Sequence, residues 1–93
     1  MKRDDEPDLE WDERKSAWNR QQRGFGFELA YKFDFASAVI VEDRRKDYGE
    51  RRYRAAGRIE GLPYMVVFTP RNGRIRIISM RRMHEKEAKA YGI

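Results

Sequence analysis

The stretch "YMVVFTPRNGRIRIIS", residues 64–79, limits the possible folds more than any other part of this 93-residue chain. Two runs rich in β-branched and apolar residues, Tyr64–Thr69 and Arg74–Arg82, are separated there by "PRNG". An Asn-Gly pair between such runs is a strong signal for a tight β-hairpin. We therefore expect two adjacent antiparallel strands, the first of which lies at the centre of a sheet because it is the most β-prone run in the chain.

The second of these strands has an interrupted pattern. Arg74 and Arg76 share one face of the strand, with isoleucines on the other, but the order slips at Ile78. As a result Ser79 and Arg81 fall on the side of the isoleucines. The slip predicts a β-bulge, or a strand whose two halves are covered by different parts of the protein.

Two further strands are expected before the hairpin. Residues 38–43, "AVIVED", form an unbroken apolar run, which predicts a strand covered on both faces. Residues 52–61, "RYRAAGRIEG", alternate between a basic set and a small or apolar set. This second pattern predicts one basic face and one packed face. The "RRKDYGE" segment between the two strands is interpreted as a solvated loop.

Helical signals occupy both ends of the chain. Asp12 can cap a helix that ends at Gly24, and Trp18 is expected to anchor this helix in the core. A second short helix is expected over Phe27–Phe33, where apolar residues recur at helical spacing. The C-terminal residues His84–Tyr91 predict a single amphipathic helix.

The order of elements is helix, helix, four strands, helix. This order predicts an α+β domain with two N-terminal helices, a four-stranded antiparallel sheet and a C-terminal helix. The length fits one domain over residues 9–93, after a flexible acidic tail at residues 1–8 that lacks apolar periodicity. The helices are expected to pack on one side of the sheet and to leave the other side open.

The charge of the chain is unevenly distributed. The whole chain has a net charge of +5, but residues 1–13 hold two basic and seven acidic residues, so the remaining eighty have a net charge of +10. Such a basic body suits a polyanionic partner, because neutralising phosphates releases their counterions. The open sheet face is expected to present guanidinium groups to phosphate from five positions: Arg52, Arg54, Arg58, Arg74 and Arg76.

Composition also argues against several kinds of site. The chain has no cysteine and a single histidine, His84, so neither disulfides nor a metal site are expected. It has no long apolar run, which argues against a membrane span and a secretory signal. We therefore expect a cytoplasmic protein without a cofactor.

Four stretches of the sequence resemble the BrnT toxins of BrnT/BrnA type II toxin–antitoxin modules: "EWDERKSAWN", "GERRY" followed by Gly57, "VVFTPRNGRIRIIS" and "RRMHEKEAKAY". The resemblance covers Leu9 to Tyr91. It implies a RelE-like fold, an endoribonuclease that inhibits translation, and a BrnA-like ribbon-helix-helix antitoxin through which the toxin reaches operator DNA. One departure is that "QRG", residues 22–24, stands where the family usually has Lys-His-Gly, so that Arg23 replaces the family histidine.

RNA cleavage without a metal requires a base for the 2′-hydroxyl, stabilisation of the pentavalent phosphate and an acid for the leaving oxygen. Glu50 is the expected base, because it lies just ahead of the basic strand, whose guanidinium groups would place it beside the phosphate. Arg52 and Arg81 are expected to stabilise the phosphate. The acid has no candidate. The other residues expected to bind RNA are all arginines: Arg23, Arg54, Arg58, Arg71 and Arg76.

Structural roles compete with these functional ones. Glu50 and Arg52 can form an ion pair within a loop, and Arg81 with Glu87 can fix the last strand to the last helix. The replaced histidine also leaves a second hypothesis open. The chain can be a catalytically weak or inactive toxin homologue that acts as an antitoxin-binding or RNA-binding module in operon autoregulation.

Overall fold

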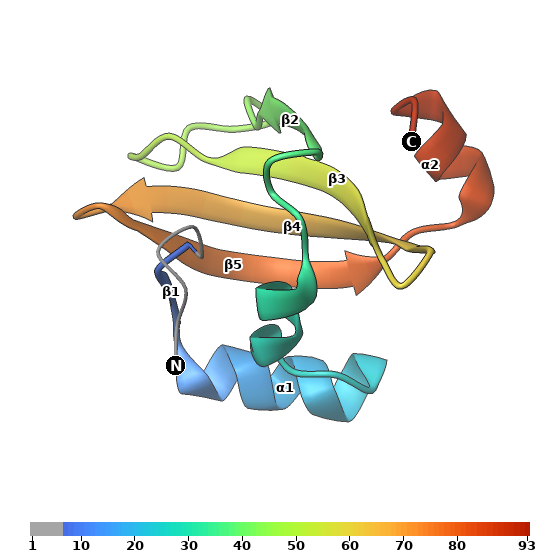
Figure 1. Ribbon diagram of the computed structural model, residues 1–93. Coiled ribbons are helices and arrows are strands. Elements are labelled where there is room, and N and C mark those ends of the chain that lie inside the picture. The colour runs from blue at the N-terminus through green and yellow to red at the C-terminus, as the bar shows by residue number, and fades with distance from the viewer. Residues whose placement is uncertain (1–6) are drawn as a thin grey trace.

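The computed structural model describes residues 7–93, which form an α+β fold around a five-stranded sheet (Figure 1). The strands are β1 (Leu9–Trp11), β2 (Val39–Glu42), β3 (Tyr53–Ile59), β4 (Leu62–Arg71) and β5 (Arg74–Arg82), in the spatial order β1-β5-β4-β3-β2. The helices are α1 (Glu13–Arg23), the 3₁₀ helix η1 (Phe27–Lys32) and α2 (Glu85–Ala90). No helix of these residues is long and apolar enough to cross a membrane.

The predicted hairpin is confirmed at the centre of the sheet. β4 is the middle strand and is buried from Pro63 to Thr69. The turn to β5 consists of Asn72 and Gly73, whose φ angles of 53° and 77° are both left-handed. Two such residues give a turn whose twist matches that of the flanking strands, which is why an Asn-Gly pair is suited to this position.

The predicted β-bulge is also confirmed. Val67 of β4 pairs with Ser79, but the next residue, Phe68, pairs with Ile77. Ile78 is therefore an extra residue in β5 with no partner on β4. The bulge explains why the sequence alternation slips at this position.

The sheet is mixed, and the prediction of four antiparallel strands is wrong in this respect. Leu9–Trp11 form β1, which runs parallel to β5, with Leu9 opposite Ile75. Just ahead of β1, the backbone N of Ile75 donates to the carbonyl oxygen of Asp8 over 2.8 Å. Three residues are too short a segment for periodicity to reveal, because only pairing with β5 makes them a strand. Most of the predicted tail, residues 1–8, lies outside the described residues.

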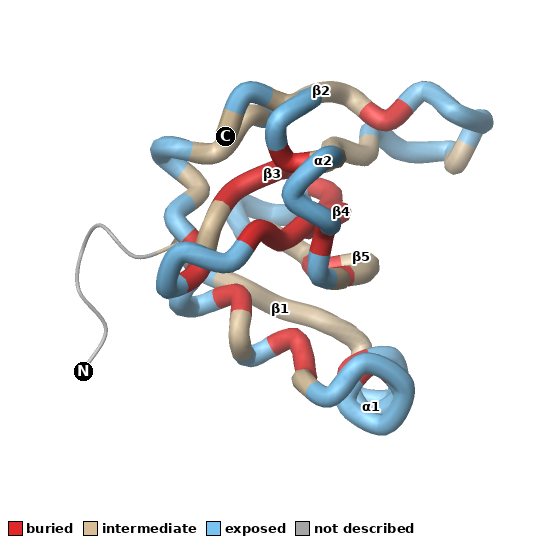
Figure 2. The backbone as a smooth tube through the Cα atoms, turned by 90° about the vertical axis from the view of Figure 1, so that its right-hand side faces the viewer, coloured by how far each residue is buried: buried red, intermediate tan, exposed pale blue. Residues whose placement is uncertain are grey.

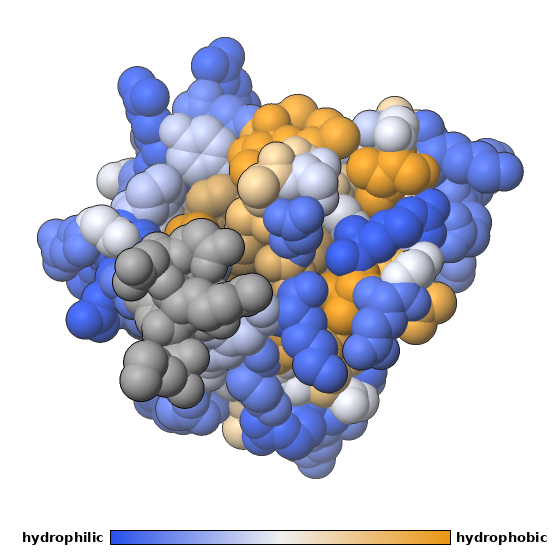
Figure 3. Space-filling model, viewed as in Figure 1, coloured by the Kyte–Doolittle hydropathy of each residue, from blue (hydrophilic) through white to orange (hydrophobic). Residues whose placement is uncertain are grey.

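The expectation that residues 38–43 form a strand covered on both faces is wrong. β2 is an edge strand, and Ile40 on it is 43% exposed. Apolar side chains reach the surface over β2 in Figure 3. A continuous apolar run is compatible with a half-exposed edge strand as well as with a covered strand, so the pattern alone does not separate the two.

Helices pack on both faces of the sheet, not on one. The larger core lies between the sheet and η1 and includes Phe27, Phe33 and Phe68. A smaller core on the opposite face brings Ala88 of α2 against Met65 and its neighbours on β3 and β4. β3 and β4 are consequently buried along most of their length, whereas α1 is mostly exposed (Figure 2).

The expectation that Trp18 anchors α1 in the core is wrong, because its side chain is 53% exposed. α1 is held instead by two buried polar residues. The hydroxyl of Ser16 accepts a hydrogen bond from the backbone N of Phe27 at 2.8 Å, and Asn19 Nδ2 donates to the carbonyl oxygen of Phe25 at 2.9 Å. The helix thus docks by hydrogen bonds to the following loop, which an apolar stripe does not predict.

Candidate functional site

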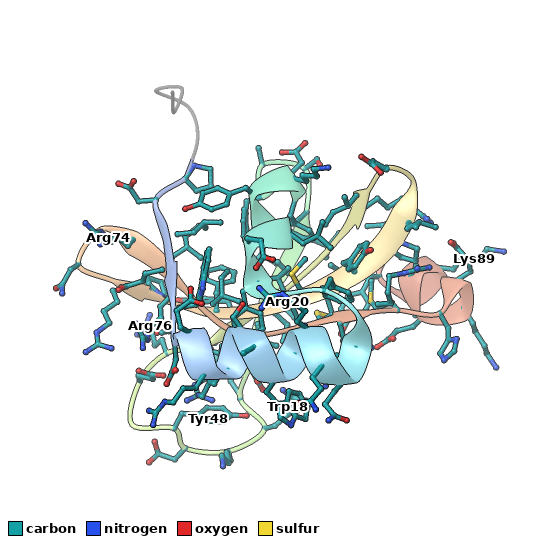
Figure 4. The ribbon with its side chains drawn as sticks, turned by 90° about the horizontal axis from the view of Figure 1, so that it is seen from below. Trp18, Arg20, Tyr48, Arg74, Arg76 and Lys89 are labelled. Atoms are coloured by element: carbon teal, nitrogen blue, oxygen red, sulfur yellow. The ribbon has the colours of Figure 1, made fainter. Side chains whose placement is uncertain are left out.

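Most of the predicted site arginines lie on the sheet face opposite η1. We call this the basic face; it comprises Arg54 and Arg58 of β3, Met65, Val67 and Thr69 of β4, and Arg76, Ser79 and Arg81 of β5. α2 covers one end of it. Figure 4 shows Trp18 of α1 and Tyr48 of the β2–β3 loop on this side of the sheet, whereas Arg20 points towards η1.

Four of the predicted arginines form ion pairs with carboxylates of the same chain. The pairs are Arg52–Glu50 (3.0 Å), Arg58–Glu85 (2.9 Å), Arg76–Glu10 (3.4 Å) and Arg81–Glu87 (2.8 Å). Both structural alternatives considered from the sequence are therefore present. The number of arginines overstates the positive charge that is available to a ligand, because these carboxylates neutralise four of them.

Arg58 has a structural role at the end of the chain. Its guanidinium donates to both carboxylate oxygens of Glu85 and to the carbonyl oxygens of Gly61 and Ile93. These hydrogen bonds to Glu85 raise the pKa of Arg58. The side chain thus connects the β3–β4 turn, α2 and the C-terminus, and its donors are committed to protein acceptors.

Arg81 joins β5 to α2. Its two terminal nitrogens donate to the two oxygens of Glu87 at 3.0 and 2.8 Å, a bidentate pair. Hydrogen bonds from Arg81 lower the pKa of Glu87, so this carboxylate stays charged at neutral pH. The same bonds raise the pKa of Arg81, while the nearby charge of Arg45 lowers it. Arg45 of the β2–β3 loop therefore lies close enough to Arg81 for the two charges to interact, although Arg45 is itself paired with Asp43.

Arg54 differs from these arginines. Within residues 7–93 it forms no ion pair, and its Nε is the one buried side-chain nitrogen or oxygen without a hydrogen-bond partner. A buried donor left without a partner costs about 1–3 kcal/mol. The terminal nitrogens of Arg54 are not buried and also have no partner within these residues, so they are available to an anion. Arg54 pairs with Val67 on the central strand, so its side chain starts from the middle of the basic face.

The β2–β3 loop, which was predicted to be solvated, holds side chains that bond to a buried acid. This acid is Asp43, the last residue of the strand predicted over residues 38–43. The side chain of Asp43 is 1% exposed and lies within hydrogen-bonding distance of Arg45 Nε (2.7 Å), Arg45 Nη2 (2.7 Å) and the Tyr48 hydroxyl (3.2 Å), all of which donate to it. Tyr48 in turn lies under Arg52, whose guanidinium carbon is 4.2 Å from the ring centroid. The available sequence signal was an aspartate at the end of an apolar strand.

Replacing Asp43 by asparagine should lower the free energy of unfolding by about 2 kcal/mol at pH 7, because charged hydrogen bonds to a buried carboxylate are lost. The hydrogen bonds from Arg45 hold the pKa of Asp43 well below its usual range. The stabilisation of the folded protein by the Asp43 carboxylate is therefore fully present at pH values above the ordinary aspartate pKa of about 3.9. This stabilisation is lost progressively as the pH falls below that value. Urea denaturation of the wild type and of Asp43→Asn at several pH values measures the free energy of unfolding of each protein.

The control for Asp43 is Arg44→Ala, because the Arg44 side chain is 83% exposed and its ion pair with Glu42 should contribute less than about 1 kcal/mol. The difference between wild type and Asp43→Asn should shrink between pH 5 and pH 2. A difference that is the same at pH 7 and pH 2 would show that the carboxylate charge is not the cause.

The remaining predicted residues do not all gather in one place. Thr69 connects the start of β3 to β5, because its hydroxyl donates to the carbonyl oxygen of Arg51 at 2.7 Å and its Cα pairs with that of Arg76. Arg71 is exposed at the hairpin, opposite Arg74. The structure thus places Glu50 and Arg52 next to the row of Thr69 and Arg76, and Arg54 one row further towards the middle of the basic face. Arg71 lies at the hairpin tip.

Arg23 fixes the end of α1 to the sheet. Its Nη1 donates to Asn19 Oδ1 at 3.1 Å and to the carbonyl oxygen of Met80 at 3.0 Å. Its guanidinium carbon also lies 5.3 Å from the centroid of the Trp18 ring. Among residues 7–93, no group of three or more His, Asp or Glu side chains is arranged to hold a metal ion.

These features define a small basic α+β protein whose cations gather on one face of its sheet. Residues 11–87 match the family described as ribonuclease toxin, BrnT, of type II toxin-antitoxin system, and the chain belongs to this family. A comparison of the sequence with curated proteins found no match. The family resemblance identified from the sequence is thus confirmed, together with the class of ribonuclease toxins and an antitoxin as partner.

Proposed function

We propose that this chain is a RelE-like, metal-independent endoribonuclease that inhibits translation in the cytoplasm and is neutralised by a BrnA-like ribbon-helix-helix antitoxin. The observation that carries this proposal is the match to a ribonuclease toxin family over residues 11–87. Arg54 on the basic face supports it, because its guanidinium has no carboxylate partner within residues 7–93 and a phosphodiester would supply one for its terminal nitrogens.

The proposed reaction is transesterification within the RNA backbone. The 2′-oxygen forms a bond to the adjacent phosphorus while the bond from phosphorus to the 5′-oxygen breaks, which gives a 2′,3′-cyclic phosphate and a 5′-hydroxyl. A base takes the proton of the 2′-hydroxyl, and the leaving oxygen gains a proton. Arginine side chains stabilise the extra negative charge of the pentavalent phosphate, which forms during this displacement.

Arg54 and Arg52 are the proposed phosphate ligands. They lie two residues apart along an extended segment, so their side chains start from the same side of the chain about 6.6 Å apart. Arg54 offers its two terminal nitrogens, which have no hydrogen-bond partner within residues 7–93 and which, unlike its Nε, are not buried. Arg52 uses its own Nε for Glu50, which leaves its terminal nitrogens for an anion. Arg81 adds positive potential, and its direct contact with phosphate would require that Glu87 be displaced.

Glu50 is the better of the two carboxylates for the base. Only one of its oxygens bonds to Arg52, and its side chain is 38% exposed, so the other oxygen can accept a proton. Both oxygens of Glu87 are occupied by Arg81. Proton transfer by a positioned side chain contributes about 10²- to 10⁴-fold to such a reaction.

The proposal is tested with the purified, antitoxin-free chain and an unstructured RNA. We expect cleavage to 2′,3′-cyclic phosphate ends that chelation with EDTA does not reduce. Glu50→Gln should lower the cleavage rate by about 10²-fold or more. The control is Glu60→Gln, because Glu60 lies in the β3–β4 turn with a side chain that is 77% exposed. Intact RNA at micromolar concentrations of folded wild-type protein would overturn the proposal.

A second candidate function is a toxin homologue that binds but does not cut. The ion pairs of Arg52, Arg58, Arg76 and Arg81 favour it, since each neutralises a cation that catalysis could use. Induction of the gene alone separates the two candidates: growth arrest that the antitoxin relieves supports the ribonuclease. Continued growth, together with tight antitoxin binding in vitro, supports the binding module.

A further inference from the structure

A hollow of about 180 Å³ lies between α1 and β5, next to the basic face. It is lined by Lys15, Trp18, Asn19, Phe27, Ile78 and Ser79. Ser79 pairs with Val67, which pairs with Arg54, so the hollow and Arg54 lie in the same row across three neighbouring strands. A ligand that is bound to Arg54 can therefore extend across β4 into this hollow.

The β-bulge shapes one wall of the hollow. Ile78 has no partner on β4, and both Ile78 and the following Ser79 line the hollow. Without the bulge, consecutive side chains would point to opposite faces of the sheet. The bulge changes the direction of the side chains beside it, so that two consecutive residues can line the same hollow. Such bulges occur often beside functional sites. Within residues 7–93 the Ser79 hydroxyl has no hydrogen-bond partner, so it is available to a ligand.

Trp18 forms the opposite wall. Its ring is 53% exposed although α1 packs against the sheet, so core packing does not account for this side chain. The guanidinium of Arg23 lies over the ring, and Trp18 nevertheless stays more than half exposed. An exposed, flat aromatic side chain beside cations is the arrangement on which nucleobases stack in proteins that bind single-stranded nucleic acids.

The lining selects the chemistry of the ligand. Phe27 and Ile78 give an apolar floor, Lys15 adds a positive charge, and none of the lining residues is acidic. The volume is below the roughly 300–1,000 Å³ of sites for drug-sized molecules, so the hollow suits one ring system and not a whole oligonucleotide. A flat aromatic group attached to an anion satisfies all of these features together.

We propose that this hollow binds the base of an unpaired RNA nucleotide, stacked on Trp18, when the neighbouring phosphate lies on Arg54. This inference rests on the proposed RNA substrate and adds the position of one base. Lys15 and Ser79 contact the polar edge or the phosphate of that nucleotide. Trp18 thereby determines how tightly, and at which sites, the protein binds single-stranded RNA.

The test uses a fluorescently labelled tetranucleotide with 2′-O-methyl riboses, which binds but cannot be cleaved through its 2′-oxygen. Fluorescence anisotropy gives the dissociation constants of the wild type, Trp18→Ala and Trp18→Phe. We expect Trp18→Ala to weaken binding by about 5- to 100-fold, because a stacked base is lost, whereas Trp18→Phe retains a flat ring and most of the affinity. The matched control is Tyr31→Ala, since Tyr31 is 51% exposed on η1, on the other side of the sheet.

A second probe isolates the base. An abasic tetranucleotide with the same phosphates should bind the wild type and Trp18→Ala equally, because only phosphate contacts remain. The inference is overturned if Trp18→Ala binds the intact tetranucleotide as tightly as the wild type, if the wild type does not bind it, or if Trp18→Ala weakens only the binding of the antitoxin. Because binding is measured without cleavage, a protein that binds through Trp18 but leaves RNA intact refutes the proposed catalysis and supports the base site.

Discussion

Replacing Arg54 by methionine should lower the rate of RNA cleavage by about 10²- to 10³-fold, the effect of removing one preorganised donor to a developing oxyanion. Methionine keeps the apolar stem that lies beside Val67 and removes the donors. Among residues 7–93, Arg54 has no carboxylate partner that the substitution would leave behind. The rate is measured with a single-site RNA substrate at saturating protein.

The stability of the same variant makes the prediction specific. Removal of a buried, unpartnered donor should change the free energy of unfolding by less than about 0.5 kcal/mol or should raise it, because sites built for ligands are often not optimised for stability. Arg58→Met should behave in the opposite way, with a lower thermal midpoint and little change in cleavage by the folded protein, since Arg58 connects Glu85, Gly61 and Ile93.

A third substitution controls for charge. Arg74→Met removes one positive charge from an exposed position in the hairpin, so general electrostatic attraction should fall by the same amount as in Arg54→Met. We expect a change in cleavage of less than about 3-fold for this variant. If Arg54→Met and Arg74→Met reduce cleavage equally, Arg54 acts only through net charge and is not a phosphate ligand.

Replacing Gly57 by alanine should lower the free energy of unfolding by about 2 kcal/mol. A Cβ atom at this position would lie 2.8 Å from Cζ and 3.0 Å from Cε1 of Phe33. Phe33 is 4% exposed and packs edge-on against Phe35, with 4.9 Å between the ring centroids, so the ring cannot move away freely. Overpacking a core in this way costs about 1–3 kcal/mol. For a domain of this size, the midpoint of thermal unfolding should fall by roughly 10 °C.

The double variant Gly57→Ala with Phe33→Leu identifies the cause. A smaller side chain at position 33 should make room for the new methyl group, so the double variant should be more stable than the sum of the two single effects predicts, by at least about 1 kcal/mol. Additive effects would show that the clash with Phe33 is not what destabilises Gly57→Ala. Gly57 lies in β3 between Arg54 and Arg58, so its close packing also keeps the basic face in register.

The sequence by itself determined the features that a few neighbouring residues control. Asn72 and Gly73 adopt the left-handed angles of the hairpin turn because asparagine tolerates this conformation and glycine has no Cβ atom to oppose it. The slip in alternation at Ile78 revealed the bulge, since side chains of a strand alternate with a period of two. Asp12 and Gly24 likewise marked the ends of α1 through local capping. The family resemblance rested on such contiguous stretches.

The tertiary structure decided which charges are free. Arg76 pairs with Glu10 and Arg58 with Glu85, residues that are 66 and 27 positions apart in the chain. The sequence predicted an arginine face and offered the local pairs of Arg52 with Glu50 and of Arg81 with Glu87 as alternatives, but it could not predict these two distant pairs. The physical reason is that an ion pair depends on where distant segments meet, whereas alternation and capping depend on adjacent dihedral angles. For the same reason the three-residue strand β1, the buried Asp43, the exposed Trp18 and the unpartnered Arg54 became evident only when the chain was folded.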